Sequence, residues 1–168
     1  MAVDFGTYQW IVYLHIFGVF VFLIAHGVSS GVGFRLAKER NRDRVAALLD
    51  FSASSYRVML LGFWWILITG LVLGYLGDWF GARWFWAAIV TLIVLSGLMT
   101  PLAAIPYNRV RAILGLRAPL RRRRARVAAN GGTGDLAEAL AKISPFPSAI
   151  VGILGLGILL WLMIFKPF

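Results

Sequence analysis

The sequence contains no cysteine and only seven acidic residues among its 168 positions. Without cysteine, the chain can form no disulfide, no thiolate metal site and no redox-active thiol pair. None of the acidic residues lies within a long apolar stretch, where a proton path or a secondary transporter usually places one. The sequence also shows no nucleophile-and-base pattern and no phosphate-binding loop. These absences together favour a role that is not enzymatic.

Long apolar runs, in contrast, dominate the chain, which is 60% hydrophobic. Four runs cover residues 8–29, 58–76, 84–105 and 148–165. Each is close to the roughly 20 helical residues that cross a hydrocarbon core about 30 Å thick. The first run follows no basic segment and has no clear cleavage site, so we interpret it as a retained helix rather than a signal peptide. The sequence therefore predicts an all-α polytopic membrane protein, a single domain folded as an antiparallel bundle of four transmembrane helices.

The basic residues predict how this bundle is oriented. Nearly all of the 17 lysines and arginines lie in two loops, residues 30–57 and 106–147. Loops rich in basic residues stay on the cytoplasmic side, so we expect both termini outside. The positions of the tryptophans support this orientation. The amphipathic ring of tryptophan prefers the membrane–water interface, and several tryptophans lie near the predicted outer boundary. They are Trp10, Trp79, Trp84, Trp86 and Trp161.

The net charge of +10 suggests two classes of binding partner, nucleic acid and anionic lipid. A nucleic-acid surface would combine basic residues with aromatic side chains for base stacking, and the two loops show no such alternation. Anionic lipid needs no special geometry and attracts arginines that lie beside membrane helices. We therefore expect lipid head groups, and no nucleic acid, at a set of loop arginines. They are Arg57, Arg109, Arg111, Arg121, Arg122, Arg123 and Arg124.

The loops themselves contain short helical patterns. Apolar positions within residues 45–49 follow helical spacing, which predicts an interfacial helix capped by Asn41 or Asp43. Residues 107–114 have the same character, and residues 135–143 are expected to form a further short helix.

Proline and glycine predict local features of the spans. Pro101 and Pro106 are expected to kink or end the third helix at its cytoplasmic side. Glycines spaced four apart allow membrane helices to approach closely. Two such pairs occur, Gly27 with Gly31 and Gly70 with Gly74.

Two histidines, both in the first apolar run, are the main functional candidates, because ionisable residues at membrane depth are rare. His15 and His26 are separated by a rotation about 20° beyond three full helical turns and by about 16 Å along the axis. They therefore face nearly the same side, which Gly18, Phe22 and Ser29 share.

This face has several interpretations. One is a haem b site, although no third histidine completes bis-histidine ligation and one haem cannot join His15 to His26. Methionine can also ligate haem iron; Met59 and Met99 lie near the predicted depth of His26, and Met163 near that of His15. Alternatively, each histidine hydrogen-bonds to a neighbouring helix or to head-group water, or serves a pigment, a quinone or a proton path.

The first two-thirds of the chain, to about residue 107, contains Leu14-His15, the arginine-rich loop and the tryptophan-rich turn GDWFGARWFW at 77–86. Through these features it resembles small bacterial four-span membrane proteins, which implies a place in the inner membrane of a bacterium. Such proteins include an uncharacterised family, the CopD-like copper-resistance proteins and the HemJ-type protoporphyrinogen oxidases. The last resemblance implies a functional His15 paired with a lysine on a later helix, but no lysine lies within these spans. The further metal ligands expected of CopD-like proteins are also missing.

Two functional hypotheses follow from the sequence. The first is a non-enzymatic accessory subunit of a larger respiratory or photosynthetic electron-transfer complex, with other membrane subunits as partners. The second is an electron-transfer protein that holds haem b through His15 or His26. A HemJ-like oxidase or a CopD-like copper protein is a third possibility, which depends on the resemblance alone.

Overall fold

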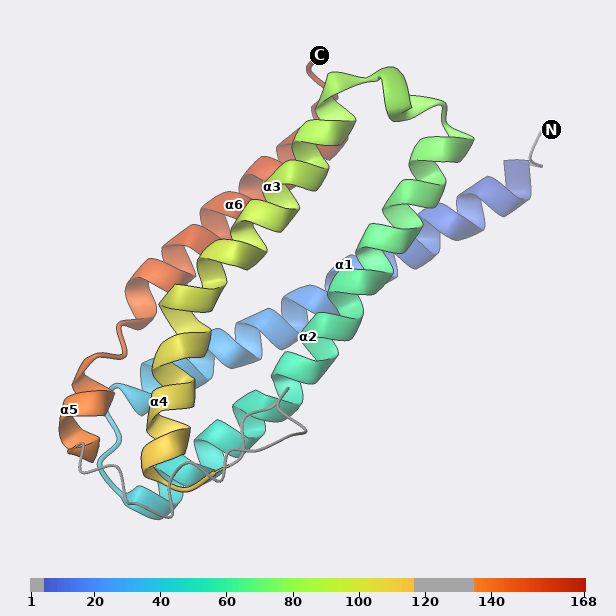
Figure 1. The fold of residues 1–168 in the computed structure, drawn as a ribbon. Coiled ribbons are helices and arrows are strands. Elements are labelled where there is room, and N and C mark those ends of the chain that lie inside the picture. The colour runs from blue at the N-terminus through green and yellow to red at the C-terminus, as the bar shows by residue number, and fades with distance from the viewer. Residues whose placement is uncertain (1–4, 117–134) are drawn as a thin grey trace.

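The computed structural model describes residues 5–116 and 135–168, and every regular element in these ranges is a helix (Figure 1). In chain order the elements are α1 (Phe5–Leu36), α2 (Arg42–Leu76), η1 (Trp79–Gly81), α3 (Arg83–Met99), η2 (Thr100–Ala104), α4 (Ile105–Ile113), α5 (Leu136–Ala141) and α6 (Pro145–Phe165). Four helical segments are long and apolar enough to cross a membrane, and they contain α1, α2, α3 with α4, and α6. The prediction of an all-α, multi-pass four-helix bundle is confirmed.

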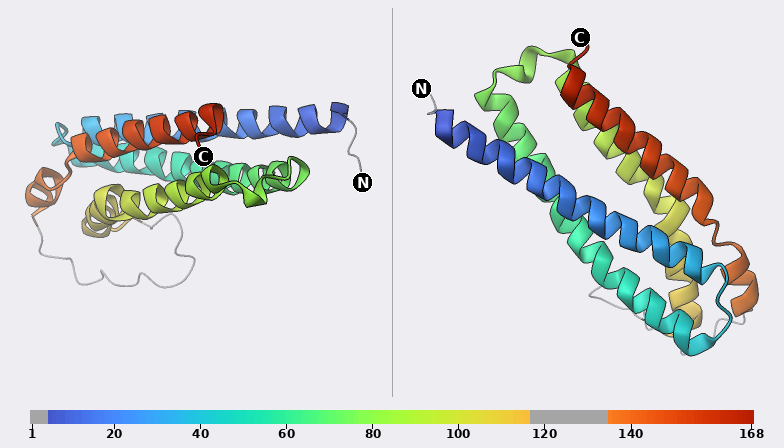
Figure 2. Two further views of the ribbon diagram at one scale, coloured as in Figure 1. Left: turned by 90° about the horizontal axis from the view of Figure 1, so that it is seen from above. Right: turned by 180° about the vertical axis from the view of Figure 1, so that it is seen from behind.

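The four long helices pack as two antiparallel pairs. α1 packs along α2, and α3 packs along α6. The pairs meet at the end that carries the α1–α2 turn and α5, and they diverge toward the end where both chain termini lie (Figures 1 and 2). We call these the loop end and the terminal end. α1 therefore contacts α2 along most of its length but approaches α6 only near the loop end.

The apolar core is best packed at the loop end. The largest fully buried side chains of the described residues all lie there; they are Leu36, Val45, Leu49, Val110 and Leu140. These residues come from α1, α2, α4 and α5, so the cluster fastens the two helix pairs together. Burial of apolar surface is favourable where water is the alternative, whereas it gives little between helices surrounded by lipid. Close packing at the loop end is thus expected for a region outside the hydrocarbon core.

The first two helices are longer than predicted. α1 continues to Leu36 and α2 begins at Arg42, so the expected 30–57 loop is a short turn between two long helices. Residues 45–49 are helical, but they form the first turns of α2 rather than a separate interfacial helix. Asn41 is confirmed as the cap, because its side-chain oxygen accepts from the amides of Asp43 (3.0 Å) and Arg44 (3.1 Å). A good cap lets the helix begin well before the apolar run.

Proline does not end the third span. α3 continues through η2, a π-helical segment, directly into α4. Pro101 lies within this segment, where the wider turn accommodates the missing amide donor. α5 confirms the short helix predicted near residues 135–143, and the Asp135 side chain caps it. α6 begins at Pro145, a position that suits the fixed φ of proline.

Candidate functional site

One side of α1 contacts three other helices, and it is the side predicted to carry both histidines. Toward the terminal end it lies against α2, where the Phe22 side chain packs on Gly62. Toward the loop end it meets α6 at His26, and the Ser29 carbonyl accepts from the hydroxyl of Tyr107 on α4 at 3.3 Å. The predicted seam of His15, Gly18, Phe22, His26 and Ser29 is therefore the packing face of α1.

His15 is hydrogen-bonded to α2. Its Nδ1 lies 2.9 Å from the Thr69 hydroxyl, and its ring rests on Gly70. The single hydroxyl hydrogen of Thr69 is directed to the Trp65 carbonyl, 2.7 Å away within α2. With the hydroxyl hydrogen so placed, the Thr69 oxygen accepts from His15, and we assign the ring proton to Nδ1 and the lone pair to Nε2.

His26 is held differently, by ring packing against α6. Its imidazole lies nearly parallel to Phe22, with ring centroids 6.2 Å apart. On the other side, a Cβ at Gly152 would lie only 2.6 Å from Nε2 of His26. A side chain at this position would therefore displace the His26 ring, and the nitrogen that usually ligates haem iron lies against the backbone of α6.

The methionines proposed as second ligands are half-buried in three different helices: Met59 in α2, Met99 in α3 and Met163 in α6. Met163 lies toward the terminal end, where α6 has diverged from α1 (Figures 1 and 2). The partner that the structure gives His15 is Thr69 rather than a sulfur. Ligation of haem by a histidine and a methionine therefore stays an untested prediction.

Trp65, which the sequence did not indicate as a candidate, also connects α1 to α2. The Trp65 indole donates to the Leu14 carbonyl at 2.9 Å, and its ring fills the space above Gly18. Gly18 lies on the same face of α1 as the histidines, and a glycine on that face was the available signal for a large side chain opposite it. His15 and Leu14 are thus both engaged by one turn of α2.

The two predicted glycine pairs behave differently. Gly70 and Gly74 receive the side chains of His15 and Phe85, as expected for close approach. Gly27 and Gly31 are exposed, and no atom of the described chain lies within 4 Å of a side chain built at either position. No helix of the described residues therefore packs against this second pair.

The arginines predicted at head groups do not form one set. Arg57 and Arg109 are exposed, as the prediction requires. Arg111 is only 3% exposed and donates to the Leu49 carbonyl and to Asn108, so the head-group prediction for this residue is wrong. Its long side chain folds inward because the α2–α4 contact offers it a carbonyl. Arg121 to Arg124 lie outside the described residues.

The described part of the chain does not gather its histidine and acidic side chains in one place. It contains no cluster of three or more histidine or acidic side chains that could hold a metal ion. The two histidines are separated along α1, and each packs against a different helix. Comparisons with protein-family models, with curated proteins and with solved structures found no match to this chain.

Proposed function

We propose that this chain is a non-enzymatic membrane subunit that packs against the helices of a larger electron-transfer assembly, respiratory or photosynthetic. The observation that carries the proposal is the unoccupied Gly27–Gly31 pair. These glycines share one exposed stripe of α1 with Phe20 and Ile24, which are 60% and 68% exposed. Small residues flanked by large apolar ones are typical of a surface where a second helix approaches closely, whereas lipid contact requires no glycine.

The state of the histidines supports a structural rather than a catalytic role. His15 is engaged by Thr69 and Gly70, and His26 by Phe22 and Gly152. Polar side chains in membrane helices commonly serve as such interhelical contacts. Both intramembrane histidines thus serve to hold the chain's own helices together.

The test is co-purification from the native membrane in a mild detergent. Gly27→Leu with Gly31→Leu should abolish recovery of stoichiometric larger subunits while the variant stays folded by circular dichroism. Gly157→Leu is the matched control, because Gly157 is also exposed with no atom within 4 Å. Recovery that is unchanged in the double variant, or lost equally in the control, would contradict the proposal. A protein that elutes as a homodimer would assign the surface to a second copy instead.

A haem-bearing electron-transfer protein is the second candidate function. One observation favours His15 over His26 as its axial ligand. The hydrogen bond to Thr69 leaves the Nε2 lone pair of His15 available, as an axial ligand requires. An absorption spectrum of the gently solubilised protein, oxidised and dithionite-reduced, distinguishes the candidates. A Soret band that His15→Ala removes would establish haem, and a featureless spectrum supports the accessory role.

A further inference from the structure

A hollow of about 440 Å³ opens at the loop end, between the last turn of α1 and the first turns of α2. The hollow is largely open to its surroundings rather than enclosed. Its lining combines two kinds of side chain. Arg35, Glu39 and Arg44 are charged, and Ala47, Leu48 and Phe51 are apolar.

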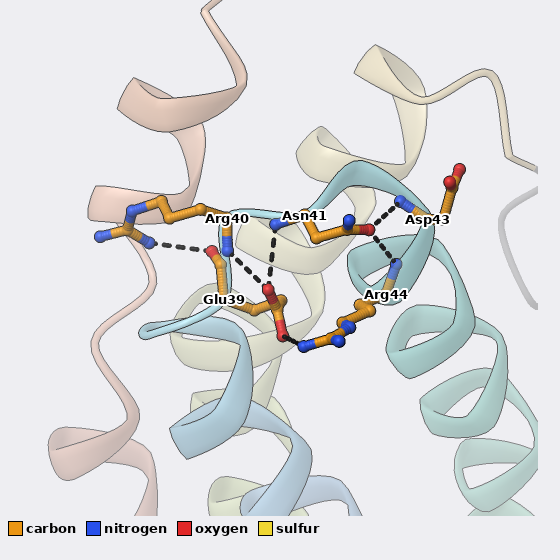
Figure 3. Close-up of polar contacts among 5 residues, drawn as sticks. All are labelled: Glu39, Arg40, Asn41, Asp43 and Arg44. Atoms are coloured by element: carbon orange, nitrogen blue, oxygen red, sulfur yellow. Dashed lines mark hydrogen bonds and ion pairs between the residues drawn. The ribbon is translucent and has the colours of Figure 1, made fainter.

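The charged side of the hollow carries excess positive charge. Glu39 is held in place by the backbone, because its carboxylate accepts from the amides of Arg40 (2.9 Å) and Asn41 (3.0 Å) (Figure 3). It also lies 3.9 Å from the guanidinium of Arg44. Arg35 makes no ion pair with a carboxylate of the described residues. Two arginines against one glutamate leave this wall with a formal charge of +1.

The apolar side lies nearer the membrane. Arg35 is the first lysine or arginine after the apolar run of α1, so it marks the level at which that helix leaves the hydrocarbon. On α2, Phe51 is 58% exposed, while Arg44 lies seven residues, or about 10 Å along the axis, farther toward the loop end. An apolar side chain so exposed is explained if lipid covers it. The hollow thus runs from an apolar wall at the membrane boundary to a cationic wall at head-group depth.

We propose that this hollow binds one acidic lipid, with its phosphate or carboxylate head group between Arg35 and Arg44 and an acyl chain against Phe51. Arginine suits this role because its planar guanidinium donates two parallel hydrogen bonds to an oxyanion. The head-group chemistry is shared with free phosphate, but only a lipid also uses the apolar wall. Of the arginines predicted from the sequence as head-group ligands, the three that the structure describes, Arg57, Arg109 and Arg111, do not line this hollow.

The experiment measures lipid bound to the delipidated full chain in a neutral detergent, by native mass spectrometry, during titration with phosphatidylglycerol or phosphatidylcholine. We expect one molecule of phosphatidylglycerol to bind in preference to phosphatidylcholine. Arg35→Gln with Arg44→Gln should weaken phosphatidylglycerol binding on the order of 25-fold, about fivefold for each arginine. Arg40→Gln with Arg42→Gln removes the same charge from exposed neighbours outside the hollow and should have a much smaller effect.

Two further measurements distinguish a lipid head group from free phosphate as the bound anion. Phe51→Ser should weaken lipid binding without changing the affinity for inorganic phosphate, measured at constant ionic strength. Circular dichroism and size-exclusion elution identify any variant that fails to fold. If the variant with both glutamines fails to fold, Arg35→Lys with Arg44→Lys replaces it, because this pair keeps the charge. Equal loss in the two double variants would overturn the proposal in favour of diffuse charge attraction. Phosphate that binds as tightly as the lipid, or no preference between the lipids, would also overturn it.

Discussion

The imidazole of His15 on α1 and the hydroxyl of Thr69 on α2 share a hydrogen bond of 2.9 Å, in which the ring donates and the hydroxyl accepts. The direction follows from the Thr69 hydrogen, which the Trp65 carbonyl already takes. His15, which the sequence marks as a candidate cofactor ligand, thus forms a hydrogen bond between α1 and α2. Thr69, as the acceptor of this bond, selects the tautomer of the ring.

Thr69→Val should lower the free energy of unfolding by about 0.6 to 2 kcal/mol, the range of hydrogen bonds between membrane helices. The shape of the residue is kept while the acceptor is lost. Denaturation by sodium dodecyl sulfate from mild-detergent micelles, followed by circular dichroism, measures the change. Thr100→Val is the control, because the Thr100 hydroxyl donates only to the Ser96 carbonyl, one turn earlier in the same span (3.4 Å). Equal effects of the two substitutions would show that the His15 contact is not stabilising.

Gly152→Ala should separate α1 from α6 at His26. The added Cβ would lie 2.6 Å from Nε2, so the ring must move, which costs about 1 to 3 kcal/mol in a packed interface. Gly157→Ala, on the same helix in open space, should be neutral or stabilising by up to about 1 kcal/mol. The same unfolding assay applies. His26→Ala should largely suppress the effect of Gly152→Ala, and simple additivity of the two changes would argue against this contact.

The turn between α1 and α2 should be sensitive to acid through Glu39. Hydrogen bonds from the amides of Asn41 and Arg40, with the nearby Arg44 charge, hold the pKa of this carboxyl below its ordinary value of 4.5. Its contribution to the turn is therefore complete above that ordinary pKa and is lost as the pH falls through the lowered one. The protection of the Arg40 and Asn41 amides against hydrogen exchange, measured by NMR at a series of pH values relative to unstructured amides at the same pH, should fall there. Glu39→Gln should remove this pH dependence, and an unchanged profile in that variant would assign it to another group.

The orientation predicted from the arginines can be tested with single cysteines, because the chain has none of its own. A cysteine at Lys38, in the loop-end turn, should be protected from a membrane-impermeant maleimide in intact bacterial cells. A cysteine at Asp78, beside η1 at the terminal end, should be labelled. Permeabilised cells provide the control for reactivity at both positions. The reverse pattern would place both termini in the cytoplasm and contradict the predicted topology.

The sequence alone determined the architecture. Hydrocarbon thickness imposes a minimum length on each span and leaves only helices for an isolated chain segment, so four apolar runs were sufficient to predict an all-α bundle. The rotation of 100° per residue also placed His15 and His26 on one face of α1 before any neighbour was known. Asn41 was similarly predicted as a cap, since capping depends on residues adjacent in sequence.

Only the tertiary structure decided what that face touches. Hydropathy marks where apolar sequence ends but not where a helix ends, so the extensions of α1 to Leu36 and of α2 back to Arg42 were missed. Whether Arg111 faces lipid or the Leu49 carbonyl depends on the distance between α4 and α2, which no local pattern encodes. The same holds for the glycines: Gly70 and Gly27 look alike in sequence, yet one receives His15 and the other is open. Their difference arises from the crossing of α1 over α2, a property of packed helices rather than of either helix alone.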